Sequence, residues 1–344
     1  MTTATGRVDA GGGPERILEH AKMVAGQMKF GYVVPFLGAG VNLCERPPRT
    51  KWRRGKYLPN ADELAHELAS AVPHYAAVVL NDLVRASQAV DHELGWASLY
   101  ETLNTVFDHE YEPTVVHHFL AEIPSLMRDL LTQPRDAHQL IVTTNYDYTL
   151  EVAFDRAGEE YDVVWYSARG DDTGKFFHLP YAATLAKPID LPNEYELSLA
   201  ERTVILKIHG AVRRGLDATS SYVITEDDYI DYLTRTDISN LIPATLVAKL
   251  KHSNILFLGY SMRDWNLRAI FHRIWQEQLR GYRAWAIRQP LSELRAGAPA
   301  KTTAARRKRE LERSLERVFW DARNVTIFDS DLAEYMRALR QAFP

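Results

Sequence analysis

The segment IVTTNYDYTLE, residues 141–151, places polar side chains where a buried strand is expected to stop. Three polar side chains follow the expected strand within four residues, those of Thr144, Asn145 and Asp147. A plain surface turn does not need so many. Because a carboxamide both donates and accepts hydrogen bonds, Asn145 can hold a water molecule or a ribose hydroxyl in one orientation. The segment therefore predicts the mouth of a nucleotide pocket. The alternative is an Asx turn in which Asp147 caps the helix that follows.

A second segment, VILKIHG at residues 204–210, is an apolar run that ends in a histidine and a glycine. An imidazole titrates near neutral pH, so His209 at the end of a strand is well placed to act as a general base. Taken singly, such a histidine is more often a hydrogen-bonded structural residue. The assignment of His209 to chemistry therefore depends on its lying beside the other polar strand ends.

A glycine-rich turn follows the first apolar run, in VVPFLGAGVN at residues 33–42. Glycines let the backbone turn sharply and bring its N–H groups close to a pyrophosphate at the start of a helix. The candidate binding residues in this loop are Gly38, Ala39, Gly40, Val41 and Asn42. The full GxGxxG pattern is absent, so a simple tight turn is an equal alternative for this motif alone.

A similar turn ends the segment NILFLGYSMRD, residues 254–264. Gly259, Tyr260 and Ser261 follow a buried run and can contact a phosphate or a ribose. Ser261 and Asp264 also have the spacing of a capping box, so the segment can equally be a well-started helix. Both interpretations can hold together.

Short, almost continuously apolar runs of this kind are typical of central strands that are covered on both faces. The runs lie at 32–37, 140–143, 204–208, 255–258, 284–287 and 325–328. Helical patterns alternate with them, at 60–72, 75–90, 95–107, 112–122, 226–234, 240–251, 264–279, 303–319 and 330–342. Asn60 is the expected N-cap of the first of these helices. The pattern predicts an α/β fold with a doubly wound, mostly parallel Rossmann-like sheet and helices on both faces.

In this order, the glycine loop, TTNYD, KIHG and GYS resemble the motifs of the sirtuin fold. In particular, they resemble the bacterial sirtuin-like proteins of antiphage defence that hydrolyse NAD, over about residues 30–290. The resemblance implies that Asn145 and His209 are the catalytic pair of an NAD+ glycohydrolase, which releases nicotinamide and ADP-ribose. Thr144 and Asp147 would support them. The dinucleotide, as substrate, would be held by Gly38, Ala39, Gly40, Val41, Asn42, Gly259, Tyr260, Ser261 and Asp264.

The resemblance and the element pattern together suggest how the chain is organised. We expect a disordered tail at 1–13, a sirtuin-like NAD-binding catalytic domain at 14–290 with a mainly helical insertion at about 60–125, and a helix–strand–helix extension at 291–344 that packs on the same domain. Two segments, 43–59 and 167–203, are rich in proline, glycine or charge and read as loops that interrupt this pattern.

Two other functions are compatible with the same loops. A protein deacylase of this fold usually carries a four-cysteine zinc module, but Cys44 is the only cysteine here, so a deacylase is disfavoured and no metal is expected. A regulatory module that only binds NAD or ADP-ribose would not need both Asn145 and His209. Attack by a ribose hydroxyl in place of water would give a cyclic product.

The amino-acid composition limits the cellular location and the binding partners that we expect. Hydrophobic residues make up 46% and charged residues 25% of the 344 residues, and the formal net charge is −4, so direct nucleic-acid binding is not expected. The mixed charges at 305–319 suggest a solvated helix face or a partner surface. A single cysteine and the absence of an apolar stretch of bilayer length indicate a cytoplasmic protein without a membrane partner. Because uncontrolled NAD hydrolysis harms a cell, the resemblance implies control by homo-oligomerisation, by a HerA-like ring ATPase or by another co-encoded defence protein.

Overall fold

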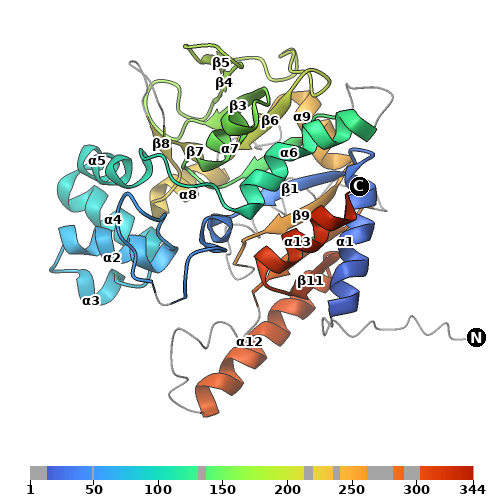
Figure 1. Ribbon diagram of the computed structural model, residues 1–344. Coiled ribbons are helices and arrows are strands. Elements are labelled where there is room, and N and C mark those ends of the chain that lie inside the picture. The colour runs from blue at the N-terminus through green and yellow to red at the C-terminus, as the bar shows by residue number, and fades with distance from the viewer. Residues whose placement is uncertain are drawn as a thin grey trace, which may run out of the picture.

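The computed structural model describes residues 14–48, 50–130, 137–212, 220–234, 241–261, 282–289 and 303–343. Within these residues, nine strands form one sheet in the order β11–β10–β9–β1–β2–β6–β3–β4–β5 (Figure 1). The parallel strands are β11 (Val325–Asp329), β10 (Ala284–Arg288), β9 (Asn254–Leu258), β1 (Val33–Leu37), β2 (Leu140–Thr143), β6 (Thr203–Lys207) and β3 (Tyr161–Tyr166). The last two strands at one end of the sheet, β4 (Phe176–Leu179) and β5 (Lys187–Ile189), are antiparallel. A short hairpin, β7 (Gly210–Ala211) with β8 (Ser221–Tyr222), forms a separate ladder.

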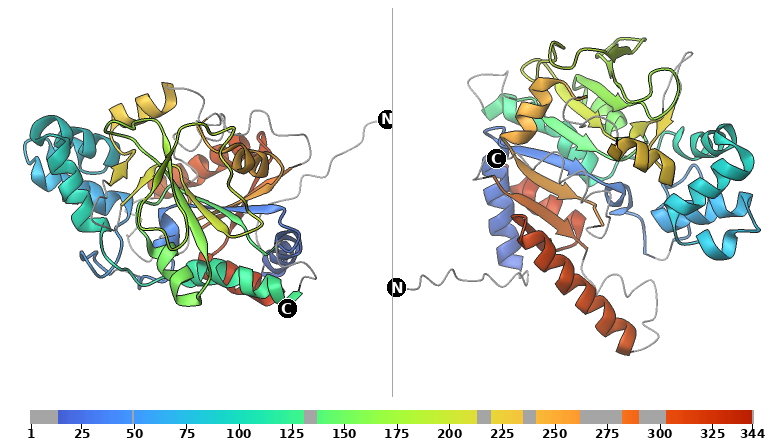
Figure 2. Two further views of the ribbon diagram at one scale, coloured as in Figure 1. Left: turned by 90° about the horizontal axis from the view of Figure 1, so that it is seen from above. Right: turned by 180° about the vertical axis from the view of Figure 1, so that it is seen from behind.

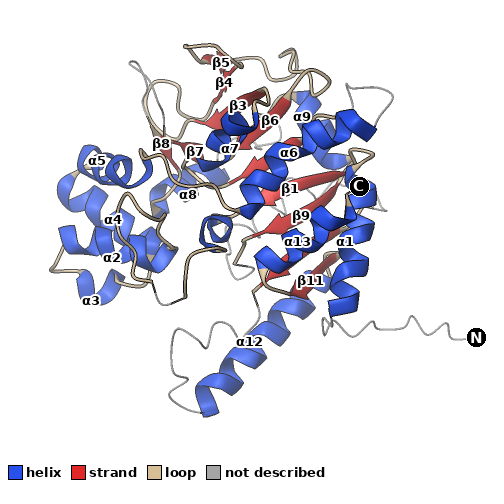
Figure 3. Cartoon of the chain, viewed as in Figure 1, coloured by secondary structure: helices blue, strands red, loops and turns tan. Residues whose placement is uncertain are grey.

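The central strands are apolar throughout because helices cover both faces of the sheet (Figures 2 and 3). Every residue of β1, β2, β6, β9 and β10 is buried. One face packs against α1 (Pro14–Met28), α6 (Val115–Leu130), α7 (Thr149–Ala157) and α13 (Leu332–Ala342). The other face packs against α8 (Glu226–Thr234), α9 (Ala244–Lys251) and α12 (Thr303–Asp321). The predicted doubly wound, mostly parallel fold is confirmed.

A group of helices between β1 and β2 stands to one side of the sheet, on the left in Figure 1. It contains α2 (Ala61–Ala71), α3 (Ala76–Val79), α4 (Leu83–Leu94) and α5 (Trp96–Phe107), and we call it the helical module. Asn60 caps α2 in a capping box with Glu63, as predicted. The module has its own apolar core, which also takes in Tyr148 and Tyr222. It is therefore packed onto the segments that follow β2 and β6.

Several elements were not predicted from the sequence, namely α1, β3, β7, β8 and the strands β4 and β5, which lie in the segment 167–203 that was interpreted as a loop. The strand β3 was missed because Asp162 interrupts its apolar run; in the structure this buried carboxylate accepts hydrogen bonds from Tyr181 N–H and from Arg202. The helix α1 was missed although Ile17, Ala21 and Val24 recur along it at helical spacing. The predicted helix at 264–279 lies outside the described residues.

The C-terminal part belongs to the same layers as the rest. Strand β11 pairs in parallel with β10, and α13 packs against α1 and α6. No helix in the described ranges is both long enough and apolar enough to cross a membrane.

Candidate active site

The carboxyl ends of the parallel strands meet at one edge of the sheet, and a cavity of about 830 Å³ lies there. The chain runs from β1 to β2 on one side and returns on the other side of β1 as β9. Loops that leave neighbouring strands in opposite directions open a crevice, which is where doubly wound folds bind ligands. A volume of this size falls in the range of sites for small molecules and cofactors.

Most of the predicted site residues line this cavity, although they come from four separate segments. They are Ala39, Gly40, Asn42, Thr144, Asn145, Asp147, His209, Gly259, Tyr260 and Ser261. Gly38 is not part of its lining, and Val41 is fully buried in the core shared with α6. Asp264 lies outside the described residues.

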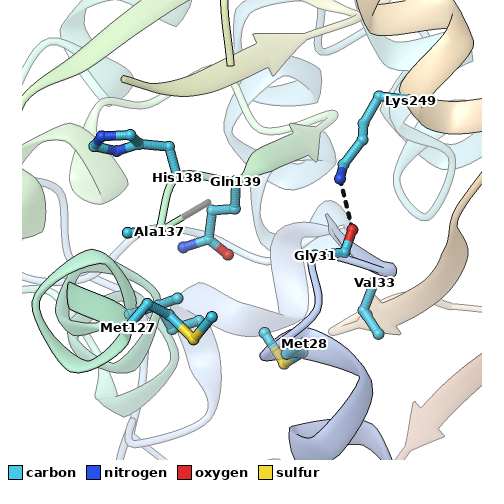
Figure 4. Close-up of a pocket in the computed structure, with 9 residues that line it drawn as sticks. Met28, Gly31, Val33, Met127, Ala137, His138, Gln139 and Lys249 are labelled. Carbon is cyan, nitrogen blue, oxygen red and sulfur yellow. Dashed lines mark hydrogen bonds between the residues drawn. The ribbon is translucent and has the colours of Figure 1, made fainter. Parts of the chain in front are cut away.

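A second, much smaller cavity lies at the opposite edge of the sheet, where β1 and β2 begin (Figure 4). Its volume is about 10 Å³, which is room for about one water molecule. Lys249 crosses beside it and donates a hydrogen bond of 2.6 Å to the carbonyl of Gly31. This cavity offers no space for a nucleotide.

The glycine loop is packed directly against the turn that follows β9. Gly38 N–H donates to Leu258 O at 3.0 Å, and Gly40 N–H donates to Gly259 O at 2.9 Å. A Cβ atom on Gly40 would lie 2.6 Å from the Gly259 oxygen, and Gly259 itself has a φ of +69°. The N–H groups of Gly38 and Gly40 thus hold the two loops together, whereas we expected them to face a pyrophosphate. In this structure the glycines permit a close approach of two backbones at the cavity wall.

We predict that Gly40→Ala lowers the free energy of unfolding by about 1–3 kcal/mol, because the new methyl group overlaps a backbone oxygen that cannot move alone. Urea unfolding of the purified variant measures this. Gly26→Ala is the matched control, since a Cβ at Gly26 in α1 meets nothing within 4 Å. An unchanged unfolding midpoint for Gly40→Ala would show that the two loops do not need this contact.

Asn145 is held by one contact of its backbone and one contact of its carboxamide. Its backbone N–H donates to Thr143 Oγ1 at 3.0 Å, and its Nδ2 donates to Gly38 O at 3.3 Å. The amide nitrogen therefore faces the glycine loop, and the amide oxygen is the atom that can accept a hydrogen bond from a water or a ribose hydroxyl. Next to it, Thr144 Oγ1 and the Tyr260 hydroxyl share a hydrogen bond of 2.6 Å.

Asp147 fixes this loop in place. Its Oδ1 accepts from Thr149 N–H at 3.0 Å at the start of α7, which is the Asx turn considered as an alternative above. Its Oδ2 accepts from Asn42 Nδ2 at 2.9 Å, so the carboxylate also ties the segment after β2 to the glycine loop. Both oxygens are used by protein donors, and the contribution of Asp147 is to the shape of the cavity wall.

His209 lines the cavity and is almost completely buried. Its ring stands edge-on to two tyrosines of α8, with centroid distances of 5.5 Å to Tyr229 and 5.7 Å to Tyr232. Its Nε2 is buried without a hydrogen-bond partner among the described residues. Burial lowers the pKa of His209 to about 3, so the imidazole is neutral near pH 7 and one ring nitrogen can accept a proton.

A buried ion pair lies beneath the site and was not recognised from the sequence. Lys207 Nζ is 2.6 Å from Glu151 Oε1 and also donates to the carbonyl of Asp147. Burial raises the pKa of Glu151, and the neighbouring ammonium opposes that shift. The available signal was a lysine inside an otherwise apolar strand. The pair connects the end of β6, two residues before His209, to α7 and the loop that carries Asn145.

We expect Lys207→Met to cost about 3–5 kcal/mol of folding free energy, because it leaves the Glu151 carboxylate buried and unpaired. Denaturant unfolding measures the loss. The double variant Lys207→Met with Glu151→Met should recover most of it, since it removes both charges. If the single and double variants were equally destabilised, packing at Lys207 and not the charge would be responsible.

The other end of the cavity is formed by β10, α12 and the start of α13. Its polar lining includes Arg288, Gln289, Arg313, Glu316 and Asp331. Arg288 contacts Asp329 at 2.7 Å and Glu316 at 3.1 Å. Arg288 and Gln289 directly follow an apolar run, so the strand-end rule that singled out Asn145 could also have indicated them.

The fold and the cavity together define an α/β protein with a dinucleotide-sized site at the switch point of a parallel sheet. A model of the SIR2-like domain matches residues 139–327, which is more than half of the chain. The chain therefore belongs to the SIR2-like family, as the sequence motifs indicated, and this membership indicates an NAD-related activity. No curated protein matches the chain at a significant level.

Proposed function

We propose that the protein is an NAD+ glycohydrolase, which converts NAD+ and water into nicotinamide, ADP-ribose and a proton. The observation that supports this most is the position of Asn145 and His209. They follow the neighbouring strands β2 and β6, and both line the same cavity as the glycine loop and Gly259. A carboxamide oxygen and a neutral imidazole at one site are suited to orient a water molecule and to accept its proton.

The chemistry follows from the leaving group. Nicotinamide in NAD+ is a pyridinium, so it departs as a neutral ring with the electron pair of the bond to the ribose C1′. The ribose then has oxocarbenium character, as in other glycoside cleavages. Water forms the new bond to C1′. Asn145 Oδ1 orients this water, and His209 accepts a proton from the water or from a ribose hydroxyl.

The first test is incubation of the purified protein with NAD+, with and without an acetyl-lysine peptide. Nicotinamide and ADP-ribose released without peptide support hydrolysis, and a cyclic nucleotide product instead would mean that a ribose hydroxyl attacks. Release that requires the peptide would mean deacylation. Binding of NAD+ without release would point to a regulatory module. Within the described part of the chain, no group of three or more His, Cys, Asp or Glu side chains is arranged to hold a metal ion.

We further propose that the enzyme is a cytoplasmic effector of antiphage defence that acts as a homo-oligomer or with a co-encoded partner such as a HerA-like ring ATPase. One feature supports assembly: Leu311, Leu315 and Val318 are 63–72% exposed on the outer side of α12. Their i, i+4, i+7 spacing gives an apolar stripe on one helix face. The native mass of the assembly, measured together with NAD turnover, tests this, and an active monomer would contradict it.

A further inference from the structure

The backbone of one residue, Val223, contacts both proposed catalytic loops. Val223 N–H donates to the carbonyl of His209 at 2.9 Å. The Val223 carbonyl accepts from the hydroxyl of Tyr146 at 2.8 Å, and Tyr146 directly follows Asn145. Backbone hydrogen bonds from Ile208 to Thr143 and from Val212 to Tyr146 also join these loops, and the segment around Val223 adds a third connection that bears on the distance between the imidazole and the carboxamide.

Asp228, on the first turn of α8, holds this segment. Its Oδ2 accepts from the N–H groups of Thr225 at 3.0 Å and of Ile224 at 3.3 Å, and its own N–H donates to Thr225 Oγ1 at 3.0 Å. The same helix carries the tyrosines that flank His209. Asp228 thus sets both the Val223 peptide and the walls around the imidazole.

Arg169, in the loop after β3, fixes Asp228 in turn. Its Nε donates to Asp228 Oδ1 at 3.0 Å, and its NH2 group donates to Asp91 Oδ2 at 2.7 Å. Asp91 is on α4 of the helical module. The guanidinium therefore bridges two carboxylates on different helices, which its planar fork of donors allows and a lysine ammonium does not match. Arg169 does not line the cavity.

We infer that Arg169 is a positioning residue, which sets the spacing of Asn145 and His209 through Asp228 and Val223. The expected effect on kcat rests on the proposed hydrolase function. Small displacements of groups that orient a nucleophile are costly, because reaction requires near-attack distances. Loss of Arg169 should therefore affect the chemical step more than the binding of NAD+.

The test compares Arg169→Gln with Arg202→Gln. Arg202 is a matched control because it also pairs with two carboxylates, Asp162 and Glu160, and its side chain is 30% exposed against 26% for Arg169. We expect Arg169→Gln to lower kcat at least tenfold with KM for NAD+ within about twofold, and Arg202→Gln to change neither. Arg169→Lys should not restore kcat. An unchanged kcat in Arg169→Gln overturns the inference.

A second readout separates this inference from the proposed function. The imidazole NMR signals of His209, assigned through His209→Gln, report its surroundings whether or not the protein hydrolyses NAD+. They should shift in Arg169→Gln and stay in place in Arg202→Gln. If the parent protein is inactive but the signals shift, the function is wrong and the positioning role stands. If Arg169→Gln does not fold, the same measurements on Asp91→Asn test the inference. This variant weakens the same bridge and leaves Asp228 intact.

Discussion

Replacing Asn145 with alanine should reduce the rate of NAD+ hydrolysis by at least about a hundredfold, the order expected when a positioned catalytic group is lost. The carboxamide is oriented by its contact with Gly38 O, so its oxygen points in one direction before substrate arrives. Alanine removes the only group at this position that can hold water against the ribose carbon. Nicotinamide release at saturating NAD+ measures the effect, and binding of NAD+ should persist because the backbone contacts that hold the glycine loop against the turn at Gly259 remain.

The control for this prediction is Asn193→Ala, a change of the same chemistry at an exposed residue outside the cavity lining. It should hydrolyse NAD+ at the parent rate. Circular dichroism and the unfolding midpoint of Asn145→Ala should also match the parent to within about 1 kcal/mol, since only one long side-chain hydrogen bond is lost. If Asn145→Ala consumed NAD+ as fast as the parent, the assignment of the site would be wrong.

The convergence of Asn145 and His209 could be predicted because it depends on strand ends alone. Once β2 and β6 are recognised as parallel neighbours, their carboxyl ends must lie at one edge of the sheet. The same rule places Gly259 beside the glycine loop, since β9 pairs with β1 along its whole length. Here the apolar runs carry enough information, because burial on both faces leaves little choice of element.

The residues that hold the site residues in position could not be predicted in this way. Arg169 pairs with Asp91, 78 residues away, and with Asp228, 59 residues away, and neither pairing leaves a local pattern in the sequence. Lys207 stands out inside an apolar strand, but nothing in the sequence identifies Glu151 as its partner until the fold buries them together. The contact between Gly40 and Gly259 likewise depends on two turns approaching in space. The local pattern of apolar and polar residues predicts where strands end, whereas the geometry of a site depends on such long-range contacts.

The second large effect is expected for His209→Gln, which keeps a polar side chain of similar length but cannot accept a proton near neutral pH. Loss of general-base assistance lowers rates by about 10²–10⁴, and we expect a decrease of that size in kcat. Because Nε2 is buried without a partner among the described residues, the substitution breaks no known hydrogen bond of that nitrogen in the folded protein. His74→Gln, at an exposed position outside the cavity lining, is the control and should leave the rate unchanged.

The pH dependence gives this prediction a second, independent measurement. The active form of His209 is the neutral imidazole, and burial lowers the pKa of this group to about 3. Activity should therefore fall only when the pH approaches that value, and kcat/KM should be nearly constant from pH 8 down to about 5. An exposed histidine acting as the base would instead lose half of its activity near pH 6.5. A fall centred near pH 6.5 in the parent that persists in His74→Gln would contradict this prediction, because a base with the lowered pKa of His209 does not titrate there.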